Sequence, residues 1–283
     1  MYRTQELRRF IDRHPFKSRC FSSGIGLPIV FCSIWIGSLW LSVILALIAC
    51  AGAWELCQMA RFAGKSPLTQ VAIGSSLIIV VFAHAEEAVF HPNSGWVFIF
   101  LSLVFVYFVW QIWRVRHKLS RLDWVITVLV PLYLGGLLAH GVMLRKLDEG
   151  MGWMMCAVLV TFSVDTLAYG GGKLIGRTRL APTVSPGKTW EGAIAGLVGG
   201  IVCAVLFLKL FNSDIGLAQA TLLGVLLGLA AQVGDLLESW LKRAAMVKDS
   251  GWIIFGHGGV MDRLDSIVPN LAVMYYFVRL GVQ

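Results

Sequence analysis

Polar residues that could perform chemistry are concentrated near the C-terminal end of a strongly apolar chain. Four of them share one face of a predicted helix, at i, i+3, i+4 and i+7: Asp235, Glu238, Ser239 and Lys242. Two more carboxylates, Asp262 and Asp265, stand three residues apart at the predicted start of the last helix. Carboxylates from two helices could hold a divalent cation between them, and hard oxygen ligands favour Mg²⁺. Lysine and arginine beside such a metal would bind phosphates, which suits phosphoryl or nucleotidyl transfer.

The alternative for this C-terminal cluster is a solvated run of charges that neutralise one another, the commoner fate of such a run. The full membership argues against it: Asp235, Glu238, Ser239, Lys242, Arg243, Lys248, Asp249, His257, Asp262, Arg263 and Asp265. Nine of these residues are acidic or basic, and all fall at a predicted membrane surface or in one short loop. The glycines flanking His257 predict a tight loop whose backbone approaches a ligand. His257 itself would orient a phosphate or a metal-bound water, or cap a helix.

A second polar segment, residues 180–192, ends where a helix is predicted to begin. Three of its residues are of types that bind phosphate: Ser185, Lys188 and Thr189. The Gly-Lys-Thr at 187–189 is not a Walker A motif, because Pro182 stands where that motif has glycine and no predicted strand precedes it. The alternative is an ordinary loop that caps the next helix.

Asp165 lies at the cytoplasmic end of the sixth predicted span, beside Ser163, Thr166 and Tyr169. An ionisable residue in a membrane span is costly and usually faces an interior cavity. We therefore interpret Asp165 as a site residue; a structural pair with a basic residue of a neighbouring helix is the alternative.

Composition excludes an ordinary soluble enzyme. Of 283 residues 57% are hydrophobic and 14% charged, and the mean hydropathy is +0.75, whereas soluble domains carry about 25% charged residues. Because each crossing needs about 20 apolar residues, the chain predicts an all-α, polytopic membrane bundle of about nine transmembrane helices. The predicted spans are 23–37, 38–60, 68–85, 96–113, 123–144, 151–171, 190–211, 215–237 and 264–281. Only Gly37-Ser38 separates the first two, so eight spans is the alternative.

The distribution of basic residues predicts the orientation. All of the 24 Lys and Arg residues except Arg145, Lys146, Lys209 and Arg279 fall in the N-terminal segment or in alternate loops. Cytoplasmic loops are the basic ones, which places the N-terminus in the cytoplasm and the C-terminus outside. The net charge of +8 then reflects a cytoplasmic face against anionic lipid rather than a nucleic-acid partner. Three regions follow: an amphipathic cytoplasmic segment at 1–22, a transmembrane scaffold at 23–150, and a transmembrane catalytic region at 151–283.

The C-terminal motifs resemble those of the phosphatidate cytidylyltransferases, also called CDP-diacylglycerol synthases. The signature of that family is matched at each named position by Ser239-Trp-Leu-Lys242-Arg243, Lys248-Asp249 and His257-Gly-Gly-Val-Met-Asp262-Arg263-Leu-Asp265. Also similar are Asp165 with Ala168-Tyr169, Lys173, and the segment from Leu180-Ala-Pro to Val184-Ser-Pro-Gly-Lys-Thr-Trp190. Outside residues 160–266 the likeness is in span pattern and in Ala53-Trp-Glu55. One departure is Phe255, where the family usually has proline.

The resemblance implies a reaction in which CTP and phosphatidate give CDP-diacylglycerol and pyrophosphate, with Mg²⁺ as cofactor. It implies Asp235 and Asp262 as metal ligands. It implies a catalytic group of Ser239, Lys242, Asp249, His257 and Asp265. It implies substrate binding by Asp165, Ser185, Lys188, Thr189, Arg243, Lys248 and Arg263. Lys242 would also contact phosphate.

The expected partners are CTP, phosphatidate and membrane lipids, with no nucleic acid; a homodimer is left open. The expected location is a bacterial-type inner (cytoplasmic) membrane, with the active site facing the cytoplasm. Two alternatives remain: a lipid or polyprenol kinase or a cytidylyltransferase for another lipid, and a transporter of an anionic substrate. A transporter would favour broken helices or an inverted repeat, and the sequence suggests neither.

Overall fold

The computed structural model describes residues 28, 30–89, 111, 113, 120–211, 215–251 and 258–282. The predicted N-terminal amphipathic segment, residues 23–27 and 29 of the predicted span 23–37, most of the predicted span 96–113, Phe255 and His257 lie outside these residues. The elements are α3 (Ser38–Phe62), α4 (Thr69–Val89), α6 (Arg121–Pro131), the π-helix η2 (Leu132–Gly136), α7 (Leu137–Lys146), α8 (Gly150–Ile175), β1 (Arg179–Ala181), β2 (Ser185–Thr189), α9 (Trp190–Leu210), α10 (Leu217–Ala244), α11 (Met261–Leu264) and α12 (Ile267–Gly281).

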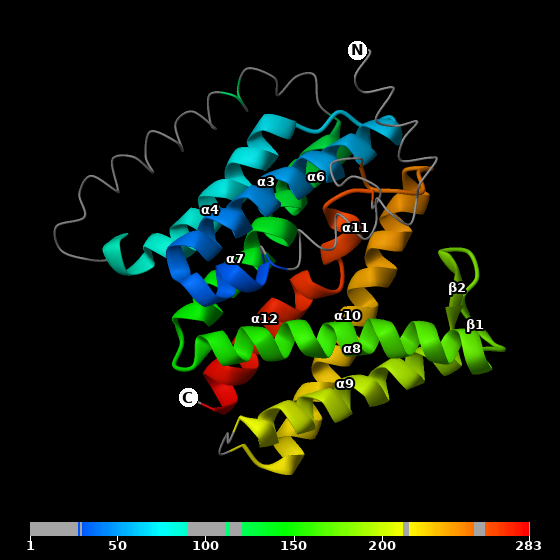
Figure 1. Cartoon of the computed structure of the whole chain (residues 1–283). Helices are drawn as coiled ribbons and strands as arrows, with labels where there is room; N and C mark the ends of the chain where they lie inside the picture. Colours follow the sequence, from blue (N-terminus) through cyan, green and yellow to red (C-terminus); the bar gives the residue numbers. More distant parts are fainter. Residues whose placement is uncertain are drawn as a thin grey trace.

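The helices form two groups joined by α12 (Figure 1). Helices α3, α4, α6 and α7 pack together in the first group, while α8, α9 and α10 pack together in the second. Helix α12 contacts α7 on one side and α8 and α10 on the other. The boundary between the groups falls near residue 150, where the sequence predicts the change from scaffold to catalytic region.

Five helices in the described part of the chain are long and apolar enough to cross a membrane: Leu39–Phe62, Arg121–Lys146, Gly150–Ile175, Trp190–Leu210 and Leu217–Ala244. Two shorter apolar helices, Thr69–Ala85 and Ile267–Gly281, coincide with two further predicted spans. The polytopic helical class is therefore confirmed. The number of nine spans and the cytoplasmic N-terminus stay predictions, because the structure describes only residues 28 and 30–37 of the span 23–37 and only residues 111 and 113 of the span 96–113.

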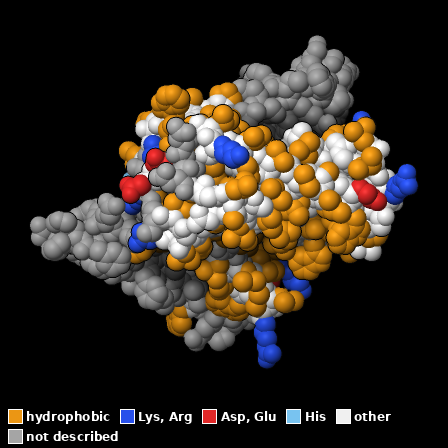
Figure 2. Space-filling view, turned by 90° about the horizontal axis from the view of Figure 1, so that it is seen from below, with side chains coloured by type: hydrophobic (Ala, Val, Ile, Leu, Met, Phe, Trp, Pro, Cys, Tyr) orange, Lys and Arg blue, Asp and Glu red, His pale blue; other side chains and the backbone are white. Residues whose placement is uncertain are grey.

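Helix α9 shows how a membrane helix divides its surface. Ile194, Val198, Val202 and Leu206 repeat every four residues and are exposed, as expected of a stripe that faces lipid. The opposite stripe is glycine at 192, 196 and 200, and it is buried. A Cβ atom at Gly196 would lie 2.8 Å from the carbonyl oxygen of Val164, so only glycine lets α9 approach α8 this closely. Figure 2 shows a broad hydrophobic surface, with few charged side chains, on the described part of one face.

The sequence did not predict the one two-stranded sheet seen in the described residues. Strands β1 and β2 pair antiparallel, with Arg179 opposite Thr189 and Ala181 opposite Ser185. The segment contains Pro182 and Pro186, and proline removes an N–H donor from a helix interior, so a helix was unfavourable here. The expected loop at 180–189 is thus a short hairpin, and the rest of the described fold is helical, as the all-α prediction requires.

Two other boundaries matter for the site. Helix α10 continues without interruption to Ala244, as expected from the polar extension of the predicted span. The last predicted span, in contrast, begins with a separate single turn, α11, so that Asp262 lies in α11 and Asp265 lies between α11 and α12.

Candidate active site

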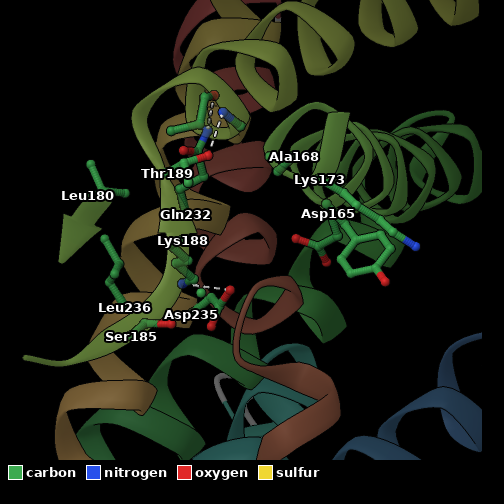
Figure 3. Close-up of a pocket in the computed structure, with 15 residues that line it drawn as sticks. Asp165, Ala168, Lys173, Leu180, Ser185, Lys188, Thr189, Gln232, Asp235 and Leu236 are labelled. Carbon is green, nitrogen blue, oxygen red and sulfur yellow. Dashed lines mark hydrogen bonds and ion pairs between the residues drawn. The ribbon is translucent and has the colours of Figure 1, made fainter. Parts of the chain in front are cut away.

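A polar pocket of about 440 Å³ opens where the hairpin meets three helices of the second group. Its chemistry-bearing lining comes from α8 (Asp165, Tyr169, Lys173), from β2 (Ser185, Lys188, Thr189) and from α10 (Gln232, Asp235). The close-up in Figure 3 places Lys188 and Asp235 beside each other and Asp165 on the facing helix, while Lys173 points away. The ammonium of Lys173 lies 6.0 Å from the ring centre of Tyr169 instead.

An ion pair between Lys188 and Asp235 lies in the wall of this pocket. Lys188 Nζ is 2.7 Å from Asp235 Oδ2, and both side chains are part-exposed. Geometrically the contact is an ion pair without an aligned hydrogen bond, and Lys188 Nζ has no hydrogen-bond acceptor among the described residues. Buried N–H donors are nearly always paired. The donors of Lys188 are therefore available for an anionic group in the pocket.

The hairpin fixes Lys188 by contacts at both of its ends. Arg243 Nε donates to the carbonyl oxygen of Val184 (3.2 Å), which ties the turn to α10. At the other end Thr189 caps α9, since its hydroxyl oxygen accepts a hydrogen bond from Gly192 N (3.2 Å). The predicted substrate residues Arg243 and Thr189 thus also have structural contacts; the hydroxyl hydrogen of Thr189 is left to donate elsewhere.

Asp165 faces two other carboxylates. The charges of Asp265 and Asp235 both act on it, and Ser266 Oγ lies 3.5 Å from its Oδ1. Helix α10 approaches the backbone of Asp265 closely at Gly234, where a Cβ would overlap the Asp265 carbonyl. The pocket therefore brings together acidic groups from α8 and α10 with Lys188, and the charge of Asp265, in the turn before α12, acts on Asp165 from nearby.

Asp262 occupies a different environment beneath the loop that follows α10. Its Oδ1 accepts from Lys242 Nζ (2.7 Å), and its Oδ2 accepts from Ser250 N (2.9 Å), Ser250 Oγ (2.9 Å) and Gly259 N (2.8 Å). Burial raises the pKa of Asp262, but the hydrogen bonds from Lys242 and from the Gly259 and Ser250 amides outweigh it and hold the pKa below its usual range. Asp262 is a satisfied, ionised carboxylate.

Between these two environments lie Glu238 and Asp265. Lys242 Nζ is 3.2 Å from Glu238 Oε2, and Glu238 is almost fully buried. Burial and the nearby charge of Asp235 raise the pKa of Asp265, which lies beside Glu238. The charges of Asp265 and Glu238 both act on the buried hydroxyl of Tyr133, which has no hydrogen-bond partner among the described residues. Tyr133 belongs to η2, the wide turn that follows Pro131, and such turns often mark functional sites.

Sequence reasoning located much of the polar machinery but not all of it. Asp165, Ser185, Lys188, Thr189 and Asp235 line one pocket, as a shared role would require. Ser239 Oγ lies 3.5 Å from Asp235 Oδ1. The side chains of Lys248, Asp249 and Arg263 are exposed, and His257 lies outside the described residues. The analysis did not foresee the contributions of Tyr133, Gln232 and Ser250, for which no local pattern gives a signal.

The predicted metal ligands Asp235 and Asp262 are held by different lysines. Asp235 fits a hard cation, because it lines the pocket near two other carboxylates. Asp262 fits one only if Lys242 releases Oδ1, since Oδ2 already accepts three hydrogen bonds. Within the described ranges, no three side chains of His, Cys, Asp or Glu already lie close enough to hold a metal ion.

The apolar bundle, with a pocket lined by both acidic and basic side chains, defines a polytopic membrane protein. A family model described as "Cytidylyltransferase family" matches residues 17–281, so the chain belongs to the cytidylyltransferase family and is a nucleotidyltransferase.

Curated relatives agree over nearly the whole chain. A phosphatidate cytidylyltransferase of Haemophilus influenzae is 29% identical over 294 residues, which cover 93% of this chain and 99% of the relative. Its counterpart from Synechocystis sp. is 32% identical over 294 residues, or 93% of this chain and 96% of the relative. Phosphatidate cytidylyltransferase 5, chloroplastic, from Arabidopsis thaliana is 47% identical over 130 residues, or 44% of this chain and 32% of the relative.

Proposed function

We propose that the protein is a phosphatidate cytidylyltransferase, which converts CTP and phosphatidate to CDP-diacylglycerol and pyrophosphate in phospholipid biosynthesis. Relatives with this name span nearly the whole chain. The structural observation that carries the proposal is Lys188, whose ammonium lines a pocket in a membrane bundle and, among the described residues, is paired with Asp235 alone. A phosphate group is the natural acceptor for such a donor.

The reaction needs no protein nucleophile, because a phosphate oxygen of phosphatidate can attack the α-phosphorus of CTP directly. The bond from that phosphorus to the bridging oxygen breaks, and pyrophosphate leaves. The work of the protein is to align two polyanions and to neutralise their charge. Lys188 contributes to this neutralisation from the hairpin, and Ser185, three residues earlier in β2, also lines the pocket.

We propose Mg²⁺ as cofactor, with Asp235 as one ligand and Asp262 as a second after Lys242 has moved from Oδ1. When bound, the ion would neutralise negative charge on the phosphates. Support comes from the chemistry of the pocket, whose carboxylates repel one another unless a cation or a proton lies between them.

We further propose that the site faces the cytoplasm of a bacterial-type inner membrane. Basic residues surround the hairpin, including Arg177, Arg179 and Arg243, and basic surfaces are typical of the cytoplasmic side. A reporter fused after Gln283 is expected on the outer side. A cytoplasmic reporter at this point would overturn the odd number of spans.

The activity is tested with the purified full-length protein in detergent. CTP with phosphatidate is expected to yield CDP-diacylglycerol and pyrophosphate in equal amounts. Replacing CTP by ATP, or phosphatidate by diacylglycerol or a polyprenol, is expected to abolish the product. Formation of a phosphorylated lipid and CDP would instead identify a lipid kinase. A CDP-lipid formed from a polyprenyl phosphate but not from phosphatidate would identify a different lipid acceptor.

A further inference from the structure

Glu55 of α3 reaches from the N-terminal group into the loop that carries the signature motif. Its side chain is fully buried. Oε1 accepts from Val260 N (2.9 Å), and Oε2 accepts from Met261 N (3.0 Å) and lies 3.2 Å from Ser250 Oγ. These partners are about 200 residues away in sequence. In the sequence, Glu55 stands out only as part of the Ala53-Trp-Glu55 segment.

Two glycines of the loop are explained by the Glu55 carboxylate. A Cβ atom at Gly251 or at Gly259 would overlap the carboxylate oxygens of Glu55. Gly258, with φ at 86°, brings its backbone against the carboxylate of Asp262 in the same way. The glycine pattern predicts that the loop backbone approaches a ligand, and that stays a prediction; at Gly251, Gly258 and Gly259 the backbone approaches carboxylates of the protein itself.

Ser250 connects Glu55 to Asp262. Its hydroxyl lies 3.2 Å from Glu55 Oε2 and 2.9 Å from Asp262 Oδ2, although a hydroxyl has only one hydrogen to donate. Three consecutive backbone amides form a second connection between the two carboxylates. The amide of Gly259 donates to Asp262, and the amides of Val260 and Met261 donate to Glu55. A change at Glu55 must therefore shift the donors that hold Asp262.

Asp262 in turn fixes the position of a positive charge. Lys242 Nζ bridges Asp262 Oδ1 (2.7 Å) and Glu238 Oε2 (3.2 Å). Glu238 lies beside Asp265, which feels the charge of Asp235 in the pocket wall. A continuous set of contacts thus leads from the N-terminal helices to the pocket.

We infer that Glu55 is a positioning residue of the active site: it holds Ser250 and the amides of Val260 and Met261. Through Ser250 it sets the place of Asp262 and Lys242. The N-terminal half is then part of the catalytic apparatus rather than a membrane anchor alone. The catalytic consequence rests on the proposed function, whereas the anchoring of the loop does not.

The test compares Glu55→Gln with a matched control, Asp123→Asn. Asp123 is also a buried carboxylate of the N-terminal group, and it accepts hydrogen bonds from Ser66 N (2.6 Å) and Ser120 N (2.9 Å) at the start of α6. In Glu55→Gln one acceptor oxygen becomes an NH₂ group, which would face the amide N–H of Val260 or of Met261. Two donors would then face each other, and that hydrogen bond would be lost. The control makes a comparable change without touching the loop.

We expect both variants to unfold at lower temperature and only Glu55→Gln to lose turnover. Its kcat per folded molecule is expected to fall about 10- to 100-fold, with a smaller change in the KM for CTP, because a small misplacement of a catalytic group acts on the transition state. Equal kcat losses in the two variants, or wild-type kcat in folded Glu55→Gln, would overturn the inference.

A second measurement separates this inference from the proposed function. Hydrogen–deuterium exchange without substrate is expected to be faster at the amides of residues 259–261 in Glu55→Gln and unchanged there in Asp123→Asn. Unchanged exchange in Glu55→Gln would refute the anchor even in an active enzyme. Wild-type protein that makes no CDP-diacylglycerol would refute the proposed function while the exchange result stands. If Glu55→Gln does not fold, Ser250→Ala takes its place: a several-fold loss of kcat supports the link, and wild-type kcat refutes it.

Discussion

Two lysine–aspartate pairs of equal length lie in contrasting parts of this molecule. Lys188–Asp235 and Lys242–Asp262 are both 2.7 Å apart. The side chains of the first pair are 25% and 34% exposed in the pocket wall, and those of the second are 14% and 9% exposed beneath the loop. An exposed pair contributes little to stability and can exchange partners with a ligand. A buried pair is costly to break, because it leaves an uncompensated charge.

The contrast assigns different roles to residues of the same type. Asp262 has four hydrogen-bond donors around it, whereas Asp235 has one lysine and a distant hydroxyl. We therefore expect the pocket pair to act on substrate directly. We expect the pair beneath the loop to hold the site in shape for as long as Lys242 keeps Asp262 from a metal ion. Four experiments can break or sharpen this division.

The largest expected effect is that of Asp235→Asn. The substitution keeps the size and the hydrogen bonding of the side chain but removes the charge that a cation would need. We expect a folded protein whose kcat/KM falls by about 1,000-fold, equivalent to about 4 kcal/mol of transition-state stabilisation. The measurement is pyrophosphate release against Mg²⁺ concentration. Near-normal turnover with an unshifted Mg²⁺ requirement would remove Asp235 from the metal and leave it as the partner of Lys188 only.

Lys242→Met should act on stability. It leaves the buried carboxylates of Asp262 and Glu238 without their shared cation, and breaking a buried pair costs about 3–5 kcal/mol. Chemical unfolding in detergent, followed by tryptophan fluorescence, gives the free energy of unfolding. A variant as stable as wild type would show that Lys242 is not the structural cation of the loop, and the comparison of the two pairs would fail.

Lys188→Ala should show the reverse pattern. We expect the free energy of unfolding to change by less than about 1 kcal/mol, because the pair is part-exposed. We expect kcat/KM to fall about 100-fold, because Lys188 supplies the donors that lack an acceptor in the pocket. An unchanged kcat/KM in the folded variant would reduce Lys188 to a surface partner of Asp235.

The smallest expected effect is a pH dependence with opposite signs at Asp262 and Asp265. The lowered pKa of Asp262 gives stability that is present above its unfolded pKa and is lost as pH falls through the folded value. Asp265 faces Asp235, Glu238 and Lys242, and its pKa is raised, which gives the opposite pH dependence. The folded protein keeps the Asp265 proton to a higher pH than the unfolded chain does. Stability therefore falls as pH rises from the unfolded pKa to the folded pKa.

Asp265→Asn tests this difference. The variant is expected to gain stability relative to wild type as pH rises above the unfolded value of about 4. Asp262→Asn is expected to lose stability relative to wild type as pH rises toward that value from below, because the folded pKa of Asp262 is lowered. Thermal unfolding midpoints at several pH values give the comparison. Parallel pH profiles for wild type and Asp265→Asn would contradict the assignment of a raised pKa to Asp265.

What the sequence by itself determined is what short stretches of chain control. Apolar runs of membrane length predict α3, α8, α9 and α10 because burial in lipid depends only on local composition. The helical period places Asp235, Glu238 and Lys242 on one face of α10, and the described helix keeps that face in contact with the site. Local hydroxyls, glycine and lysine likewise predict the polar character of the 185–189 segment.

Only the tertiary structure decided which partner each charge has. Lys188 could have paired with its neighbour Glu191, but the hairpin turns it toward Asp235, while Glu191 accepts from Thr178 N. Asp262 forms an ion pair with Lys242 and does not lie with Asp235 at one site. Glu55 accepts hydrogen bonds from the amides of Val260 and Met261, far away in the chain. Hydrogen bonds and ion pairs act over a few ångströms and leave no periodic pattern in the sequence, so their partners are fixed only when the helices pack.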